Sequence, residues 1–554
     1  MQFAKRRGIA TSGIAIIVIA IFLVSGAGSL GASAATTVPA QKSSADPTPV
    51  MGWSGWSFLR INASESQVEG EALAMVTSGL HSVGYTYVNI DDGWYQCPGP
   101  QGPNVDKYGR WVVNAVNYPP VGSENGIQAL ASYVHSLGLK FGIYTTAGIS
   151  MQAVIENTPV LGTSYTADEI VLYPLTEQAN YNCGGMVMLN YKSPGAQAFV
   201  NSIVDEWASW GVDYIKLDGI NDCGICTPAG ATNEPDVAAW SHAILQSGRP
   251  MVLDTTEGNF YVSMGPWLKE YSNQWAMASD IEINGPDEGS ANSCYTPPYT
   301  GCLSVFPLTN YSWWGSGTYD GGSNVVNRFL DVANWQPYGG PYGFNDYDSI
   351  EVGDGPANSG MSYAAEESQL SLWALGSAPL ILGSDLTSKV TNAYGSSSGL
   401  DPIDFTLLTN RQVIEVDQDS IDASRISKVG TAQVFAKVEP EGDGIVGLFD
   451  TNTNLKASND IISTTTSAIG LPSDRFGYFV QNLWTGQTWT ISSSGKISAS
   501  VPPEGVALYR VTPITASHSP PTSWWSIPTL LFEEWHGIAG RLSLFSLRFG
   551  IRRT

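Results

Sequence analysis

Three observations in the sequence predict a (β/α)8 TIM barrel followed by a C-terminal antiparallel β-sandwich domain. From Met51 to about Asp419, short β-rich runs alternate with amphipathic helical patterns, which is typical of a parallel sheet covered by helices. About eight strand candidates fall in this stretch, and eight strands close a barrel. After about residue 420 the helical pattern fades and alternating β runs replace it. The length of 554 residues suits a barrel with a smaller second domain.

The repeats of the barrel can be followed in order. Ser64 and Gln67 resemble a capping box, apolar residues at helical spacing follow over 68–76, and a strand is expected at 85–90. The next two helical patterns stop at Gly138 and Gly211. The remaining strand candidates are a run at Met51, 140–145, 214–218, 251–255, 275–279, 378–382 and a weaker run before Asn345.

The ends of the chain differ from this repeat. Basic residues at 5–7, an apolar run at 14–24 and Ala-Ser-Ala at 32–34 predict a signal peptide over residues 1–34, so the protein is expected to be secreted and extracellular. An uncleaved anchor that holds a structural protein at the cell surface is the alternative. Residues 35–50 have the composition of a linker.

The catalytic barrel is expected over residues 51–419 and the antiparallel β domain over 420–513. In the latter, alternating runs at 433–438, 445–449 and 506–511 predict strands, with Asp443-Gly444 as a hairpin turn. Residues 514–554 form a tail with no assigned role.

Composition excludes some partners. The net charge is −24 with 26 Lys and Arg residues, and phosphate binding needs clustered basic residues, so neither nucleic acid nor, after signal cleavage, a membrane is expected as a partner. The oligomeric state is left open.

Export favours disulfides among the six cysteines. Cys294 with Cys302 is the expected local bridge, and Cys183 with Cys223 or Cys226 is the expected long one. Cys223 and Cys226 have zinc-ligand spacing, but no second pair stands at finger spacing, so no metal is expected.

Carboxylates stand at the ends of several predicted strands. Asp91-Asp92, Asp218, Glu257 and Asp280 each follow or end a β-rich run. The carboxyl ends of barrel strands carry the active site. Because cleavage of a glycosidic bond needs one ionised carboxylate and one protonated carboxyl group, this pattern predicts a sugar-cleaving enzyme that binds a carbohydrate substrate.

Two of these acids form a candidate catalytic pair. Lys216 and Asp218 point to the same side of their strand, and the lysine is expected to keep Asp218 ionised at neutral pH, as a nucleophile requires. Asp280 can serve as proton donor if burial raises its pKa. The alternative for Lys216 and Asp218 is a structural salt bridge at the end of a strand. The alternative for Asp280 is a helix N-cap.

Aromatic residues stand beside other acids. Asp91 and Asp92 with Trp94 suit the binding of vicinal sugar hydroxyls and of a sugar ring face, and a solvated turn is the alternative. Trp53 and Trp56 suit either core packing or sugar stacking.

Seven motifs in this order resemble the melibiase-type α-galactosidases of glycoside hydrolase family 27. They are MGWSGW, YVNIDDGW, GLKFGIYTTAG, WGVDYIKLDG, GFNDYDSIEVG, SLWALGSAPLILGSDL and VIEVDQD. The resemblance implies hydrolysis of terminal α-galactosides with retention through a covalent glycosyl-enzyme, with Asp218 as nucleophile and Asp280 as acid/base. No metal or organic cofactor is implied.

The resemblance also implies a sugar subsite, formed by Trp56, Asp91, Asp92, Tyr144, Lys216 and Asp348. Glu257 and Phe260 stand where the family selects galactose with a free 2-hydroxyl over N-acetylgalactosamine.

The sequence departs from the family at two positions. Ala276 stands where an arginine usually contacts the 2-hydroxyl, so that contact is missing or replaced from elsewhere. Gly93 stands where the family often has a cysteine, whose partner is also absent. Two long loops, 148–182 and 282–340, either add subsites or pack over the barrel mouth.

Three alternatives stay open. A β-L-arabinopyranosidase and an α-1,6-glucan-acting enzyme would share the same chemistry. A non-catalytic carbohydrate-binding protein would use the same scaffold without it.

Overall fold

The structure is a computed structural model that describes residues 42–220, 232–256, 262–278, 280–281, 324–353, 361–387 and 400–514, without the side chains of Phe58 and Asn62. The expected signal peptide and residues 515–554 of the tail lie outside these ranges. Within the described part of the chain, no helix combines the length and the apolar character needed to cross a membrane.

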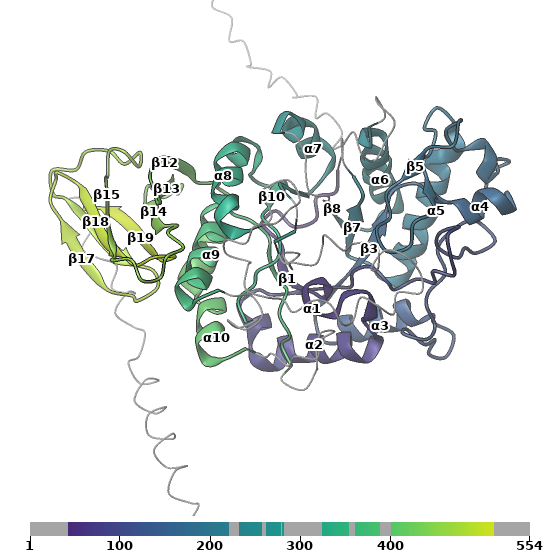
Figure 1. The fold of residues 1–554 in the computed structure, drawn as a ribbon, viewed down its shortest axis with the longest axis horizontal. Helices are drawn as coiled ribbons and strands as arrows, with labels where there is room; N and C mark the ends of the chain where they lie inside the picture. The colour runs from purple at the N-terminus through teal and green to yellow at the C-terminus, as the bar shows by residue number, and fades with distance from the viewer. Residues whose placement is uncertain are drawn as a thin grey trace, which may run out of the picture. The chain divides into compact units, whose positions relative to one another are not determined.

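Eight parallel strands form one sheet in the order β10-β9-β8-β7-β3-β2-β1-β11 (Figure 1). Their bounds are β1 Met51–Ser54, β2 Tyr87–Asn89, β3 Lys140–Thr146, β7 Tyr214–Asp218, β8 Val252–Thr255, β9 Gln274–Ala276, β10 Phe344–Asp346 and β11 Leu380–Leu382. Just after β10, Ile350 makes a parallel bridge to Leu382 of β11, which joins the two ends of the sheet. The predicted barrel is confirmed.

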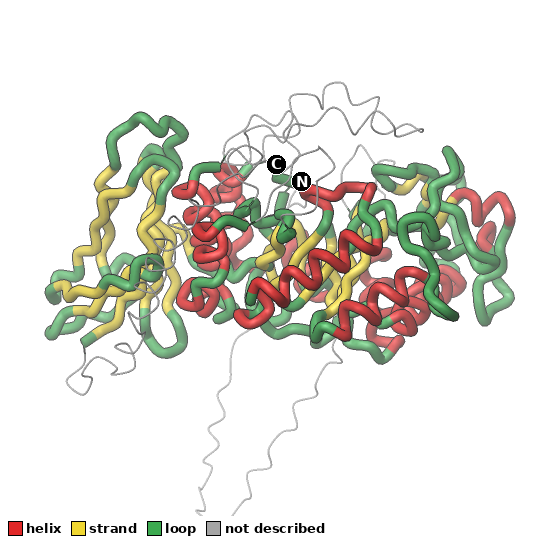
Figure 2. Tube along the Cα trace, turned by 90° about the horizontal axis from the view of Figure 1, so that it is seen from below, coloured by secondary structure: helices red, strands yellow, loops and turns green. Residues whose placement is uncertain are grey.

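Helices connect these strands on the outside of the sheet (Figure 2). They are α1 Trp56–Leu59, α2 Glu65–Ser78, α3 Gly126–Ser136, α5 Pro194–Trp210, α6 Glu234–Ser247, α7 Gly265–Tyr271, α8 Val325–Trp335 and α9 Tyr363–Leu375. Two further helices, α10 Pro402–Leu408 and α11 Arg411–Asp417, follow the last barrel strand and precede the C-terminal domain. The predicted capping box begins α2, where the Ser64 N–H donates to Gln67 Oε1 at 3.1 Å. Gly211, with a φ of 92°, ends α5 in the left-handed conformation that glycine adopts without strain.

A long excursion separates β3 from α5. We call residues 147–193 the β3 excursion; it contains β4 Ile149–Ser150, α4 Met151–Glu156, β5 Glu177–Gln178 and β6 Met186–Val187. These strands form a small antiparallel sheet in the order β4-β6-β5. The first predicted long loop is therefore folded into regular structure.

The N-terminal end of the barrel is closed by apolar side chains and by the segment 42–50. Val50, Tyr87, Tyr214, Val252 and Ile381 form one buried cluster there. Lys42 Nζ donates to the carbonyl oxygens of residues 269 and 272, at 2.6 and 2.8 Å. This part of the expected linker therefore packs on the barrel.

The C-terminal domain is a β-sandwich, as predicted. A six-stranded antiparallel sheet runs in the order β12-β13-β14-β19-β16-β17, and β15 pairs with β18 in a second sheet. The bounds are β12 Ser424–Val429, β13 Ala432–Val438, β14 Gly444–Asp450, β15 Asp460–Thr465, β16 Tyr478–Asn482, β17 Thr488–Ile491, β18 Lys496–Val501 and β19 Val506–Pro513. Apolar side chains such as Val446, Leu448 and Ile497 fill the space between the sheets.

Helix α9 joins the barrel to this domain. Ser368 Oγ donates to the Glu504 carbonyl at 2.7 Å, and Trp484 Nε1 donates to Ser371 Oγ at 2.9 Å. On the same side, Lys437 Nζ is buried and bonds to Asp419 Oδ1 at 2.9 Å and to the Val416 carbonyl at 2.7 Å. The two domains therefore share a polar, hydrogen-bonded contact.

Candidate active site

Five predicted acids lie at the carboxyl end of the barrel. Asp91 and Asp92 follow β2, Asp218 ends β7, Asp280 follows β9 and Asp348 follows β10. Parallel strands bring their carboxyl ends to one face, so these carboxylates converge there. Their charges influence one another: Asp280 and Asp91 both raise the pKa of Asp218.

Lys216 stands at the centre of this group. Its Nζ donates to Asp91 Oδ2 at 2.7 Å and lies 5.9 Å from the centre of the Tyr144 ring. The expected lysine and acid pair therefore exists, but the hydrogen-bonded partner is Asp91 on the neighbouring loop and not Asp218 on the same strand.

The pKa of Asp218 is set by opposing effects. Burial raises its pKa to about 7, although the charge of Lys216 and the Gly219 N–H, which donates to Asp218 Oδ1 at 2.7 Å, both lower it. In this site desolvation outweighs the charge of the lysine, and the ionisation of Asp218 at neutral pH stays a prediction.

Asp280 has a pKa raised to about 6, as expected from burial. Burial is the main cause and the charge of Asp348 adds to it, whereas Lys216 and Arg60 lower the pKa. Asp348 Oδ2 also accepts a hydrogen bond from the Ile281 N–H at 2.5 Å. Asp348 thus holds the backbone next to Asp280, in addition to any contact with a sugar.

The two tryptophans of the first motif have different surroundings. Trp53 is fully buried and its Nε1 donates to the Ser384 carbonyl at 2.8 Å, so it belongs to the core. Trp56 is half-buried, and the Arg60 guanidinium lies 4.9 Å from the centre of its ring. Of the two, only Trp56 can offer a ring face to a ligand.

The departures from the family pattern can be placed. Ala276 is buried in β9, and Arg60, which the sequence reasoning missed, is a cation that acts on Asp280 from the loop after β1. Gly93 has a φ of 91°, and a Cβ there would lie 2.6 Å from the Ile61 carbonyl oxygen. A cysteine does not fit this position, which agrees with the loss of that disulfide.

Glu257 and Phe260 lie outside the described residues.

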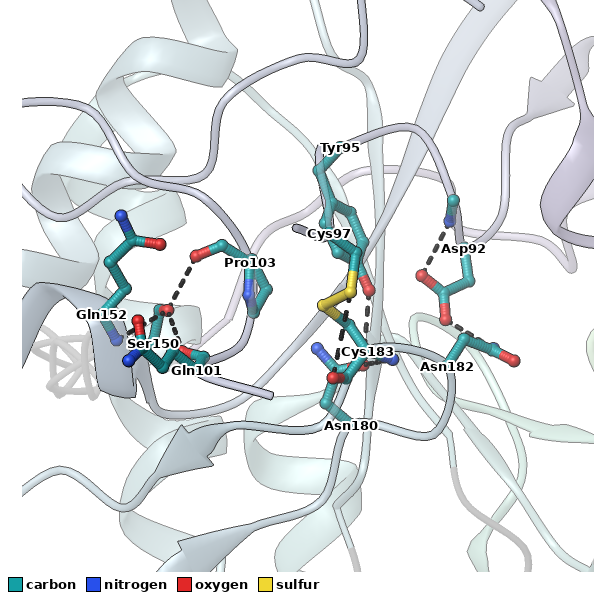
Figure 3. The surroundings of a disulfide bond; sticks show 11 residues. Asp92, Tyr95, Cys97, Gln101, Pro103, Ser150, Gln152, Asn180, Asn182 and Cys183 are labelled. Atoms are coloured by element: carbon teal, nitrogen blue, oxygen red, sulfur yellow. Dashed lines mark hydrogen bonds between the residues drawn. A yellow bond between two sulfur atoms is a disulfide. The ribbon is translucent and has the colours of Figure 1, made fainter. Parts of the chain in front are cut away.

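The disulfide pairing expected for Cys183 is wrong. Cys183 is bonded to Cys97, 86 residues earlier, with Cα atoms 5.8 Å apart (Figure 3). The β3 excursion folds back onto the loop after β2, and spacing along the sequence does not reveal this contact. The remaining candidates, Cys223, Cys226, Cys294 and Cys302, fall outside the described residues.

The same fold-back places one further side chain in the site. Asn182 Nδ2 donates to Asp92 Oδ2 at 2.6 Å, as Figure 3 shows. Burial raises the pKa of Asp92 to about 6, although hydrogen bonds from Tyr95 and Asn182 lower it. Sequence reasoning missed Asn182 because it lies within a long loop without periodicity.

Among the residues that the structure describes, no three His, Cys, Asp or Glu side chains are grouped to hold a metal ion. The chemistry available at this face is that of several carboxyl groups with raised pKa, among them Asp218 and Asp280, beside a lysine.

Comparisons with known proteins agree with this geometry. Residues 48–159 match the family described as "Alpha galactosidase A", and residues 429–511 match "Alpha galactosidase C-terminal beta sandwich domain". An α-galactosidase from Coffea arabica is 30% identical over 468 residues, covering 84% of this chain and 94% of that protein. One from Cyamopsis tetragonoloba is 28% identical over 468 residues, covering 84% and 86%.

The fold is also similar to solved structures. A GH27 β-L-arabinopyranosidase from Geobacillus stearothermophilus superposes with a TM-score of 0.67 at 23% identity, covering 85% of this chain and 98% of that one. At this identity the likeness concerns the fold alone.

Proposed function

Since this chain belongs to the melibiase-type α-galactosidases of glycoside hydrolase family 27, we propose that it is a secreted, retaining exo-glycosidase that removes terminal α-D-galactosyl residues from oligosaccharides or polysaccharides. The observation that carries the proposal is the pair of half-buried carboxyl groups, Asp218 at the end of β7 and Asp280 after β9, at the same end of the barrel and beside Lys216. No metal or organic cofactor takes part in the proposed reaction.

The proposed reaction has two steps. Asp218 attacks the anomeric carbon and forms a covalent bond as the glycosidic C–O bond breaks, and Asp280 gives its proton to the leaving oxygen. In the second step Asp280 takes a proton from water, the resulting oxygen attacks the same carbon, and the bond to Asp218 breaks. Two inversions give net retention.

The electrostatics of the site support a pair that shares one proton, while the higher pKa of Asp218 by itself favours the proton on that residue and not on Asp280. The pKa of Asp218 is about 7 and that of Asp280 about 6, and the charge of Asp280 favours protonation of Asp218. Near these pH values the pair therefore carries about one proton, which is the state that one nucleophile and one acid require. The assignment of the two roles rests on the family motifs.

The sugar subsite is built from groups that recognise hydroxyls. Asp91 and Asp92 supply acceptors, and Lys216 supplies a donor. The Tyr144 hydroxyl is buried and makes no hydrogen bond to any described residue, so a sugar hydroxyl can satisfy it. Trp56 offers its ring face.

Three other functions differ from the proposed one in a testable way. β-L-Arabinopyranosides lack the 6-hydroxymethyl group of galactose, and the Geobacillus stearothermophilus structure bears that activity in its name. An α-1,6-glucan-acting enzyme would need a different sugar. A carbohydrate-binding protein would bind sugar without cleaving it.

The deciding experiment compares hydrolysis of aryl α-D-galactopyranoside and aryl β-L-arabinopyranoside by the mature chain, with Asp218→Asn as the blank. Preference for the galactoside, lost in the variant, supports the proposal. Preference for the arabinoside would instead identify the protein as a β-L-arabinopyranosidase of the same family. Sugar binding without hydrolysis in the parent protein, retained in Asp218→Asn, favours the non-catalytic function.

Secretion is tested separately. Sequencing the N-terminus of material recovered outside the cell should give Ala35, because the small residues at 32–34 precede it. A retained N-terminus would support the anchored alternative.

A further inference from the structure

The β3 excursion contacts one of the site's carboxylates and the backbone next to a second one from outside the barrel strands. Its first contact is the hydrogen bond from Asn182 Nδ2 to Asp92 Oδ2 at 2.6 Å. The other oxygen of Asp92 accepts from the Gly93 N–H at 2.7 Å. Both oxygens of this buried carboxylate are therefore bound, and Asn182, together with Tyr95, is a side chain that holds its orientation.

The second contact reaches the chain beside Asp218. Gln178 Nε2 donates to the Gly219 carbonyl at 2.9 Å, and the Gly219 N–H donates to Asp218 Oδ1 at 2.7 Å. Gln178 is 2% exposed, and its Oε1 accepts from Asn233 Nδ2 at 2.8 Å. This buried amide is thereby fixed on both sides and holds Gly219, the residue whose N–H donates to Asp218.

The excursion itself is fastened to the loop after β2. The disulfide joins Cys97 to Cys183, which is the residue next to Asn182. At the other end Ser150 Oγ donates to the Pro103 carbonyl at 2.7 Å, and the Gln152 N–H donates to the Gln101 carbonyl at 3.0 Å (Figure 3). The excursion and this loop are therefore joined at two separate places.

We propose that the β3 excursion is part of the active site, with Asn182 and Gln178 as positioning residues that orient Asp92 and, through Gly219, Asp218. The proposal rests on the proposed function in one respect, because the proposed function assigns these carboxylates to a galactose subsite. A loop that only covers the barrel wall would not need one amide donor bonded to Asp92 in the sugar subsite and a second one bonded to Gly219 beside the proposed nucleophile Asp218.

The groups that face Asp92 suggest the test. They are Asp91, which is paired with Lys216, the hydroxyls of Tyr95 and Tyr144, and the amide of Asn182. In Asn182→Asp two carboxylates face each other, repel at neutral pH and share a proton at acidic pH, where an O–H···O bond replaces the amide bond.

For Asn182→Asp, we expect kcat/KM for aryl α-D-galactopyranoside to fall about tenfold or more at pH 7.5, mainly through KM, and to return to within about threefold of the parent at pH 5. Asn182→Ala should lose activity at both pH values without recovery. A loss in Asn182→Asp that is the same at both pH values overturns the role of Asn182.

The matched control is Asn104→Asp. Asn104 lies in the loop after β2, and its Nδ2 donates to Gln96 Oε1 at 2.8 Å and not to a carboxylate. This variant should show neither the loss nor the recovery, and the same recovery in it would overturn the proposal.

Gln178 is tested with Gln178→Met, which keeps the volume and removes both polar atoms. We expect kcat to fall about tenfold with KM changed little, because the variant loosens Asp218 and not the sugar contacts. An unchanged kcat overturns the role of Gln178. Thermal unfolding of each variant separates loss of fold from loss of positioning.

Failure of the proposed function is distinguishable from failure of this inference. If the parent protein does not cleave the galactoside, the proposed function fails, and the same pH comparison is made on galactose binding by calorimetry. A pH-dependent binding defect in Asn182→Asp then still supports the positioning role, and its absence overturns it.

Discussion

At the scale of single residues, the positions of the main side chains of the site could be predicted from the sequence, whereas their pKa values could not. The motifs were sufficient to predict that Lys216, Asp218 and Asp280 lie at the carboxyl end of the barrel, because the repeat of strand and helix fixes where each strand ends. They were not sufficient to predict that burial raises the pKa of Asp218, since desolvation depends on the whole surroundings. Asn182 could not be predicted either, because its contact with Asp92 depends on a fold-back of the chain.

The first prediction concerns the pH dependence of activity. The nucleophile must be ionised, so activity falls as the pH drops, and the acid must be protonated, so activity falls as the pH rises. With pKa values of about 6 and about 7 in the pair, we expect a bell-shaped profile of kcat/KM with its maximum near pH 6 to 7. A profile that keeps rising to pH 9 would contradict this protonation scheme.

The second prediction concerns Arg60. Its φ is 52°, a strained value for a residue other than glycine, and its guanidinium lies over Trp56 and lowers the pKa of Asp280. In Arg60→Gln the pKa of Asp280 should rise, and because it is the lower pKa of the pair, the acidic limb of the pH profile should move to higher pH.

Arg249→Gln is the control for this shift. Arg249 pairs with Asp213 at the opposite end of β7, and its Nη2 lies 2.5 Å from Asp213 Oδ1. The control should leave the limb in place. An unmoved limb in Arg60→Gln would mean that Arg60 does not act on the acid/base.

At the scale of elements, local signals placed the helices and strands better than the turns. The Ser64 capping box and Gly211 appear where expected, because caps depend on a few neighbouring residues. The predicted turn at Asp443-Gly444 is displaced: Gly444 begins β14 and pairs with Val438, and Gly442, with a φ of 95°, provides the turn. Two nearby glycines make this choice ambiguous in sequence.

The third prediction concerns the Cys97 to Cys183 bridge. Replacing both cysteines by serine should lower stability by about 2 to 5 kcal/mol and raise KM for the galactoside, because Asn182 is no longer held against Asp92. Urea unfolding and steady-state kinetics measure the two effects. Lower stability with an unchanged KM would show that the bridge supports the fold but not the site.

The fourth prediction concerns the contact between the two domains. Lys437 is 4% exposed, and its Nζ donates to Asp419 Oδ1 and to the carbonyl oxygens of residues 374, 416 and 421. Lys437→Met removes these bonds and leaves a buried carboxylate without its cation, so unfolding should become easier by about 3 to 5 kcal/mol. The control, Lys428→Met at an exposed position of β12, should change stability little.

At the scale of the whole molecule, the chain is strongly acidic and several of its carboxyl groups are buried in the fold. The net charge is −24. Burial raises the pKa of Glu71 to about 9, that of Asp422 to about 7 and that of Asp236 to about 6. These groups are protonated in the folded chain at pH values where the unfolded chain has released its protons.

The sign of the effect on stability follows from these shifts. A carboxyl group whose folded pKa is raised stabilises the fold fully below its unfolded pKa, near 4, and this contribution is lost as the pH rises through the folded pKa. Repulsion within the acidic chain grows in the same direction. We expect the melting temperature to be highest near pH 5 and to fall steadily towards pH 8, as measured by calorimetry.

Glu71 provides the variant that separates the two causes. It is buried against Asp385, whose charge adds to the effect of burial on its pKa, and its Oε2 accepts from the Leu386 N–H at 2.8 Å. Glu71→Gln keeps this acceptor and cannot ionise, so its melting temperature should fall less between pH 5 and pH 8 than that of the parent. Glu415→Gln removes the same charge from an exposed position and should leave the slope unchanged. If both variants flatten the slope equally, general charge repulsion and not the buried carboxyl groups sets the pH dependence of stability.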